Sequence, residues 1–294
     1  MQYCSNNPYN FPTPTIWLRT DHSASLVTIN QTTCSKWVDW RTGEDVGITG
    51  SATRSPYIIN SSITKTSALQ FPRGRTVNDF AYMDVISQSK FENMFSGSDL
   101  NVGYFNGYSQ AGAFACTAWS GSATRALPLS IGADLGLDLG IHLTNAGVFR
   151  FAIRTTNSVG TPSTTSQTLL NNQLITSSNA AVVMYCSAIK SDANIPSSTT
   201  TGSISHLRTI TSFLSGTVLF NNGITDSRNN FNFGINNFPS VINWIKRPIR
   251  LGASNLTASW NMFYGEWYEL MLWDRALNYK EEQNVQRYLS RWKG

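Results

Sequence analysis

Short apolar runs of strand length recur along the chain, and clusters of Gly, Pro, Asn and Ser separate them. The run GVFRFAIR shows the pattern most clearly, because Phe149, Phe151 and Ile153 fall on one face of an extended segment. Arg150 and Arg154 fall on the opposite face. A period of two predicts strands with one face in a core and one wetter face. Many such runs and a single helix predict an all-β, two-sheet antiparallel sandwich rather than βαβ units.

Composition argues against two other classes of fold for this chain of 294 residues. Charged residues make up 13%, compared with roughly 25% in an average soluble protein. A helical bundle normally carries a Lys- and Glu-rich outer face, so this shortage of charge argues against one. Nine Trp and fifteen Phe are far more than a disordered chain carries. With 41% hydrophobic residues, the chain can bury a sizeable core.

The net charge of +5 comes from Lys and Arg that are scattered along the chain. The densest cluster, Lys246, Arg247 and Arg250, is too small for the basic stripe of a nucleic-acid binder, so no nucleic-acid partner is expected. A mildly basic surface favours acidic neighbours, either another protein or an anionic glycan. We expect neither a signal peptide nor membrane insertion, since no apolar run approaches the roughly eighteen residues of a membrane span.

The four cysteines are widely spaced and have no histidine at ligand spacing, so a zinc site is not predicted. Cys116 and Cys186 lie inside apolar runs and are expected to be buried free thiols. A bridge between Cys4 and Cys34 stays open at this point. His142 is isolated in the run LGIHL and is expected to be a structural histidine.

One helix is predicted, at the C-terminal end of the sequence. Asn278 can cap it, and Glu281 three residues later nearly completes a capping box. Four apolar residues then fall on one face at helical spacing: Val285, Tyr288, Leu289 and Trp292. The helix is therefore expected to pack this stripe on the outside of the sandwich.

Residues 248–294 contain a hydrophobic-Gly pair, a Gly followed by an acidic strand, a D-R-A-L turn and a helix ending in an aromatic residue. These features are Leu251-Gly252, Gly265, Glu269, Asp274–Leu277 and Asn278–Trp292. Further matches lie near the start of the chain and in a late hairpin: Trp17, Leu18, Asp21, Ser23, Ser25, Trp37, Asp39, Gly43 and Leu219–Ile224. Together they resemble laminin-G-like jelly-roll modules of the concanavalin A-like lectin/glucanase superfamily.

The resemblance implies one jelly-roll domain over residues 1–294 with a short C-terminal helix. Segments at about 87–125, 155–180 and 225–247 are expected to be elaborated loops. Most of the matching residues are expected to be structural, with Trp37 and Trp273 in the core rather than on a ligand platform.

The same superfamily includes retaining glucanases, which need two carboxyls about 5–5.5 Å apart. The E-x-D-x-x-E run of those glucanases is absent from this sequence. In the best acidic strand, strict alternation places Glu266 and Glu269 on opposite faces. Glu266 is then a solvated edge charge, and Glu269 a buried partner for an arginine such as Arg275. We therefore expect no catalytic residue and no enzyme activity.

A structural Ca²⁺ is conceivable, because jelly-roll lectins often hold one with Asp and Asn oxygens. Asp134 and Asp138 in the run GADLGLDLG are the candidates. They alternate with apolar residues, and we favour a polar strand face or a turn instead. No specific motif supports a metal or a cofactor, so none is predicted.

Two segments combine aromatic and amide residues, Asn101–Tyr108 leading to Trp119, and Arg228–Trp244. Exposed rings can stack on a sugar while Asn side chains bond its hydroxyls, although the same composition suits a protein interface or plain loop packing. The candidate contact residues for glycan or protein are Tyr104, Tyr108, Trp119, Phe231, Asn232, Phe233 and Trp244.

These observations predict a non-catalytic structural and recognition protein, located on a virion or another extracellular surface. The neutral polar surface and elaborated loops fit a capsid-associated, spike or tail component of a virus or phage particle. Its partners would be other structural proteins of the assembly, including copies of itself, and glycans. The alternative is a free carbohydrate-binding lectin module, and a glycoside hydrolase is the third hypothesis.

Overall fold

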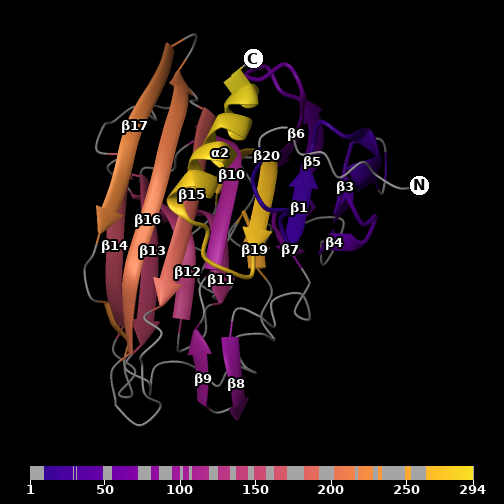
Figure 1. The fold of residues 1–294 in the computed structure, drawn as a ribbon. Coiled ribbons are helices and arrows are strands. Elements are labelled where there is room, and N and C mark those ends of the chain that lie inside the picture. Colours follow the sequence, from indigo (N-terminus) through magenta and orange to yellow (C-terminus); the bar gives the residue numbers. More distant parts are fainter. Residues whose placement is uncertain are drawn as a thin grey trace.

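The computed structural model describes residues 10–28, 30, 32–48, 55–71, 81–85, 95–99, 102–105, 108–118, 125–132, 137–144, 149–156, 162–170, 182–191, 202–215, 218–227, 231–233, 249–252 and 263–293. Two nine-stranded antiparallel sheets stack face to face, and a separate two-stranded hairpin lies beyond one end of them (Figure 1). One α-helix packs on the outside of the sheet that faces the viewer in Figure 1. The predicted two-sheet antiparallel jelly-roll sandwich with a short C-terminal helix is confirmed.

The sheet that carries the helix is called the front sheet. Its strands, in spatial order, are β17 (Val218–Ser227), β16 (Gly202–Ser215), β15 (Val182–Ser191), β10 (Tyr108–Ala118), β20 (Tyr264–Trp273), β6 (Ser67–Phe71) and β5 (Tyr57–Asn60). Two short strands complete it: β1 (Ile16–Arg19), which pairs with β20, and β18 (Phe231–Phe233), which pairs with β16.

The other sheet is called the back sheet. Its strands, in spatial order, are β14 (Pro162–Leu170), β13 (Phe149–Thr156), β12 (Leu137–Thr144), β11 (Arg125–Gly132), β19 (Ile249–Leu251), β7 (Met83–Val85), β4 (Asp45–Ile48), β3 (Cys34–Val38) and β2 (Leu26–Thr28). The hairpin outside both sheets consists of β8 (Phe95–Asp99) and β9 (Val102–Phe105). A bridge between Thr33 and Tyr57 ties the start of β3 to β5 and so joins the two sheets at that side.

Strand β20 is buried on both faces, because one face meets the back sheet and the other meets the helix. On the inner face, Trp267 packs against Phe114 with 5.0 Å between ring centroids. On the outer face, Tyr268, Met271 and Trp273 share an apolar cluster with the helix. A strand covered on both sides carries large apolar residues at nearly every position, which is the composition of YGEWYELMLW.

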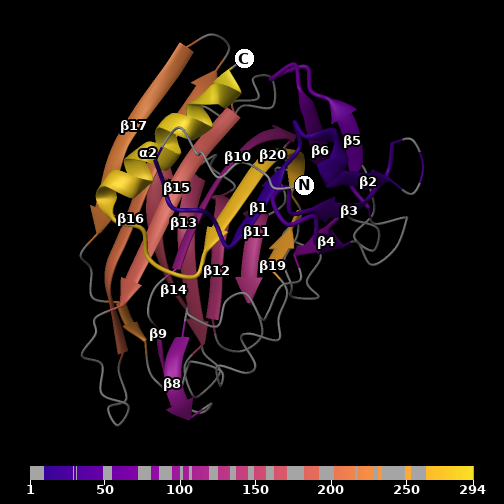
Figure 2. The ribbon, with the colours of Figure 1, turned by 45° about the vertical axis from the view of Figure 1, so that its right-hand side comes forward.

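The C-terminal helix α2 (Tyr279–Leu289) confirms the predicted helix and its cap. The Asn278 side chain accepts the Glu281 N–H at 3.0 Å, and the Glu281 carboxylate accepts the Asn278 N–H at 2.8 Å. The buried face follows the predicted stripe and continues into the 3₁₀ turn η5 (Ser290–Lys293), where Trp292 is buried. Figure 2 shows α2 lying along the outer face of the front sheet over β15 and β16. In the described ranges, no helix has the length and apolar character needed to cross a bilayer.

The prediction of elaborated loops is wrong for parts of all three segments. Residues 87–125 contain β8, β9 and all of β10, and β10 lies in the middle of the front sheet. Residues 155–180 contain β14, and residues 225–247 contain β18. The apolar run Ala111–Trp119 does predict a strand, and β10 confirms it. Strand β14 gives no such signal because PSTTSQTLL is rich in Ser and Thr, and pairing with β13 fixes its extended backbone. At Gly112 of β10, a Cβ would lie 2.6 Å from the Glu269 carbonyl oxygen, so this position needs glycine.

Trp37 and Trp273 are buried in the core, as predicted. Cys116 and Cys186 are buried free thiols, also as predicted. Cys34 is a free thiol too, and its potential partner Cys4 lies outside the described residues. Burial raises the pKa of the Cys34 thiol to about 12, which keeps it protonated and poorly reactive at neutral pH.

The cap of α2 yields a direct prediction. Asn278→Ala removes the acceptor for the Glu281 N–H and should lower the free energy of unfolding by about 1 kcal/mol. Urea denaturation measures the change, with Lys280→Ala in the exposed first turn as the matched control. Equal effects of the two substitutions would contradict the role of the cap.

Candidate functional site

Five of the seven predicted contact residues lie in described strands. Tyr104 is in β9, and Tyr108 is the first residue of β10. Phe231, Asn232 and Phe233 make up β18. The other two, Trp119 and Trp244, lie outside the described residues.

The topology brings these two segments to the same end of the front sheet, although more than a hundred residues separate them. Tyr108 pairs with Ile189 of β15, which in turn pairs with Leu207 of β16. Phe231 of β18 pairs with Ile204, which lies three residues before Leu207 in β16. The β8–β9 hairpin leads directly into β10, and Figures 1 and 2 show it beyond this end of the sheets. We call this region, formed by β8, β9, the start of β10 and β18, the hairpin end.

The acidic strand differs from the sequence prediction. The register between β10 and β20 shifts at Ala113 and Phe114, which pair with Glu269 and Trp267 and leave Tyr268 as an extra residue. A β-bulge of this kind puts two consecutive residues on one face. Glu266 and Glu269 therefore lie on the same, helix-covered face of the front sheet, and the prediction of opposite faces is wrong. The sequence of β20 alone does not reveal this bulge, because the bulge arises from the pairing with β10.

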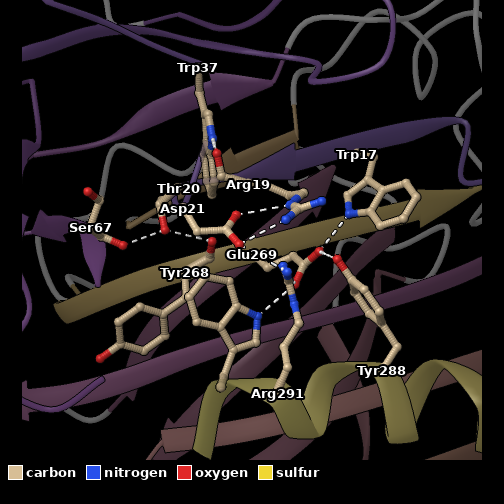
Figure 3. Close-up of polar contacts among 11 residues, drawn as sticks. Trp17, Arg19, Thr20, Asp21, Trp37, Ser67, Tyr268, Glu269, Tyr288 and Arg291 are labelled. Atoms are coloured by element: carbon tan, nitrogen blue, oxygen red, sulfur yellow. Dashed lines mark hydrogen bonds and ion pairs between the residues drawn. The ribbon is translucent and has the colours of Figure 1, made fainter. Parts of the chain in front are cut away.

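Glu269 is fully buried, and four donors fill its two carboxylate oxygens (Figure 3). Oε1 accepts the indole N–H of Trp17 at 2.6 Å and the hydroxyl of Tyr288 at 2.9 Å. Oε2 accepts the Arg291 guanidinium at 2.8 Å and the indole N–H of Trp292 at 2.6 Å. The prediction that Glu269 is buried beside an arginine is confirmed, but that arginine is Arg291 and not Arg275. Arg275 instead binds the capping residue Glu281 at 2.7 Å.

Arg291 extends this cluster to the surface. Its other terminal nitrogen lies 3.0 Å from Asp21, which also accepts two hydrogen bonds from Arg19 at 2.8 and 2.9 Å (Figure 3). Burial alone would raise the pKa of Asp21, but the hydrogen bond from Arg19 and the charge of Arg291 lower it below its ordinary value overall. The pKa of Tyr288 is raised, first by burial and then by the Glu269 charge, so its hydroxyl remains a donor.

Glu266 is also buried, with 4% of its surface exposed, so the prediction of a solvated edge charge is wrong. Its carboxylate accepts the Tyr268 hydroxyl at 2.8 Å, and Ser61 lies 3.3 Å from the same hydroxyl. The pKa of Tyr268 is raised by burial and by the Glu266 charge. The Tyr268 ring stacks on Trp292, with 5.5 Å between ring centroids, which places this pair beside the Glu269 cluster.

Asp39 is a third buried carboxylate, and it joins the sheets. It accepts the backbone N–H of Trp17 in β1 at 2.9 Å and those of Arg41 and Thr42 at 2.9 and 3.1 Å. The sequence marked Asp39 only as a match to the family's opening and did not reveal this role. Gly43, with φ +74°, ends the turn that Asp39 organises.

The two glutamates of β20 are enclosed by protein groups. Glu269 has no free face toward a substrate, and Glu266 lies on the helix-covered face beside it. Across the described ranges, no group of three His, Cys, Asp or Glu side chains could hold a metal ion. Of the two Ca²⁺ candidates, Asp138 is in β12, whereas Asp134 lies outside the described residues.

The chain matches no protein-family model and no curated protein sequence. Among solved structures, the carbohydrate-binding module CBM40 of the Ruminococcus gnavus IT-sialidase is 14% identical, with a TM-score of 0.34 over 61% of this chain and 81% of that one. The NanB sialidase of Streptococcus pneumoniae is 12% identical and has a TM-score of 0.37. The match covers 72% of this chain and 26% of the sialidase. The receptor-binding domain of botulinum neurotoxin type G is 9% identical and has a TM-score of 0.42. The match covers 95% of this chain and 51% of that domain's chain. Likeness at this level assigns neither a family nor a function to the chain.

The Glu269 cluster predicts a large loss of stability on a small change. In Glu269→Gln an uncharged amide faces four donors, and Arg291 loses its buried counter-ion, so the free energy of unfolding should fall by about 3–5 kcal/mol. Glu266→Gln is the matched control, because an amide oxygen can still accept the Tyr268 hydroxyl. Guanidinium denaturation of both variants measures the difference. A cost for Glu269→Gln no larger than that of the control would refute the cluster's role.

Asp21 predicts a pH dependence. Its pKa is lower in the folded chain than in the unfolded one, so its contribution to stability is present above the unfolded value of about 3.9. That contribution is lost as the pH falls through the lower folded value. Asp21→Asn should therefore be less stable than the parent at neutral pH, and the gap should close in strong acid. Urea midpoints of both proteins across this range test it, and a gap that is independent of pH would contradict it.

Proposed function

We propose that this protein is a non-catalytic recognition module that binds carbohydrate through the hairpin end. The observation that carries the proposal is the convergence of Tyr104 and Tyr108 with Phe231, Asn232 and Phe233 at one end of the front sheet. Binding residues are commonly placed at the ends of a rigid sheet scaffold, where short strands and connections can vary.

The chemistry of these residues suits a sugar. Aromatic rings present an apolar face on which a pyranose can stack, and amide groups donate and accept hydrogen bonds with hydroxyls. The segments supply both kinds of group, as in VGYF of β9 and FNF of β18. The net charge of +5 further favours glycans that carry acidic groups.

The buried carboxylates support the non-catalytic part of the proposal. A retaining glycosidase needs two carboxyls that reach the scissile bond from a cleft. Here Glu266 and Glu269 share a face, but α2 and η5 cover that face, and four donors hold Glu269. Both therefore have a structural use that competes with any role in bond cleavage.

A glycan array with the purified monomer tests the proposal, and it includes neutral oligosaccharides together with sialylated and sulfated ones. We expect saturable binding that weakens about tenfold or more in Tyr104→Ala or Phe233→Ala, as for aromatic hot spots. Tyr279→Ala, an exposed aromatic residue on α2, is the matched control and should bind as the parent does.

Three results would count against the proposal. Absence of binding to every glycan, combined with self-association, would favour the structural role on a viral or phage particle. Equal losses in the hairpin-end variants and the control would place the site elsewhere. Release of shorter products from any bound polysaccharide, abolished in Glu266→Gln, would show that the protein is an enzyme.

A further inference from the structure

The turn between β20 and α2, Asp274–Leu277, is tied to the elements on either side of it. The Thr15 hydroxyl, just before β1, donates to the Asp274 carboxylate at 3.2 Å and accepts the Asp274 N–H at 3.2 Å. Arg275 binds Glu281 in the first turn of α2. The turn is therefore fixed both to the start of β1 and to the helix that follows it.

The last residue of the turn, Leu277, is tied to β10 as well. Its N–H donates to the Ser109 hydroxyl at 2.8 Å, and Ser109 is fully buried while Leu277 is 3% exposed. Ser109 lies on the helix-covered face, because Ala111 and Ala113 of the same strand belong to the apolar cluster under α2. A buried N–H without an acceptor is costly, so the Ser109 hydroxyl is what allows the Leu277 N–H to be buried.

This hydrogen bond lies where the pairing of β10 with β20 begins. On its other side, β10 pairs with β15 from Tyr108 onwards, and Tyr108 lies opposite Ile189. With β20, the described pairs begin one residue later, at Ser109 opposite Trp273. The next bond that the chain leaving β20 makes to β10 is the one from Leu277 to Ser109. The start of β10 is therefore held by β15 through the backbone and by the turn through one side chain.

The turn lies at the hairpin end. Figures 1 and 2 show the connection from β20 to α2 at the same end of the front sheet as the β8–β9 hairpin. Tyr108, next to Ser109 in the sequence, is one of the residues to which carbohydrate contact is assigned above. A binding residue must be held to within about 0.5 Å by the groups that support it. The Ser109 hydroxyl is such a support for the backbone at Tyr108.

We propose that Ser109 is a positioning residue of the hairpin end, which holds Tyr108 in place for carbohydrate contact through the hydrogen bond from Leu277. This inference rests on the proposed function and adds a residue that supports the binding surface without touching the ligand. Thr15 binds the same turn from the far side of β20, so it provides a comparison that lacks this role.

The test compares Ser109→Ala with Thr15→Val in the full chain. Each substitution removes one hydroxyl from the turn and nearly keeps the size of the side chain. Both should lower the urea midpoint, and Thr15→Val by at least as much, because it removes two hydrogen bonds. Ser109→Cys, which keeps a weaker acceptor, should give intermediate values and replaces Ser109→Ala if that variant does not fold.

Hydrogen exchange followed by nuclear magnetic resonance measures, without a ligand, how firmly the start of β10 is held. We expect the amides of Tyr108 and Ser109 to exchange about tenfold faster or more in Ser109→Ala, and less than about threefold faster in Thr15→Val. Equal acceleration in the two variants would show that Ser109 has no special hold on this strand end and would overturn the inference.

Surface plasmon resonance then measures binding of α2,3-sialyllactose, a heparin hexasaccharide and uncharged lactose. For the sugar that the parent binds most tightly, we expect the affinity to fall about fivefold or more in Ser109→Ala and less than about twofold in Thr15→Val. If exchange is faster in Ser109→Ala but the affinity is unchanged, the inference is wrong while carbohydrate binding stands. Equal losses of affinity in both variants would also overturn the inference and leave the proposed function intact. If none of the three sugars binds the parent, the proposed function fails and the inference fails with it.

Discussion

The arrangement of this molecule depends on one buried carboxylate. Removing a carboxylate from water costs several kcal/mol, and the folded chain offsets that cost only if donors occupy both oxygens. Glu269 receives them from β1, α2 and η5, through Trp17, Tyr288, Arg291 and Trp292. Segments from the two ends of the described chain therefore meet at one side chain in a central strand. The same contacts fix the helix on the front sheet.

The burial of the two glutamates of β20 follows from this arrangement. Because α2 and η5 pack on the outer face of the front sheet, they bury Glu266 and Glu269 there. The proposed contact region is the hairpin end, where β9, the start of β10 and β18 lie at one end of the front sheet. The hairpin end begins where the turn before α2 meets β10, through the Leu277 N–H that Ser109 accepts.

Local patterns in the sequence predicted the parts of the fold that local physics decides. Alternation in GVFRFAIR assigned Phe151 and Arg150 to opposite faces, and the cap at Asn278 located the start of the helix. The bulge at Tyr268 could not be predicted, because it follows from pairing with β10 rather than from the sequence of β20 itself. Strand β14, PSTTSQTLL, resembled a loop because its extended backbone is imposed by β13. The hairpin-end residues were chosen for their chemistry, but only the long-range register could bring them together.

The most direct measurement of the central claim is hydrogen exchange at the tryptophan indoles, followed by nuclear magnetic resonance. If Glu269 is the sealed centre of the structure, the indole protons of Trp17 and Trp292 exchange only when the whole molecule unfolds, at the rate of the slowest amides of β20. If the two indole protons exchange as fast as those of solvent-exposed groups while the β20 amides stay protected, the helix is not anchored through Glu269, and the account is wrong.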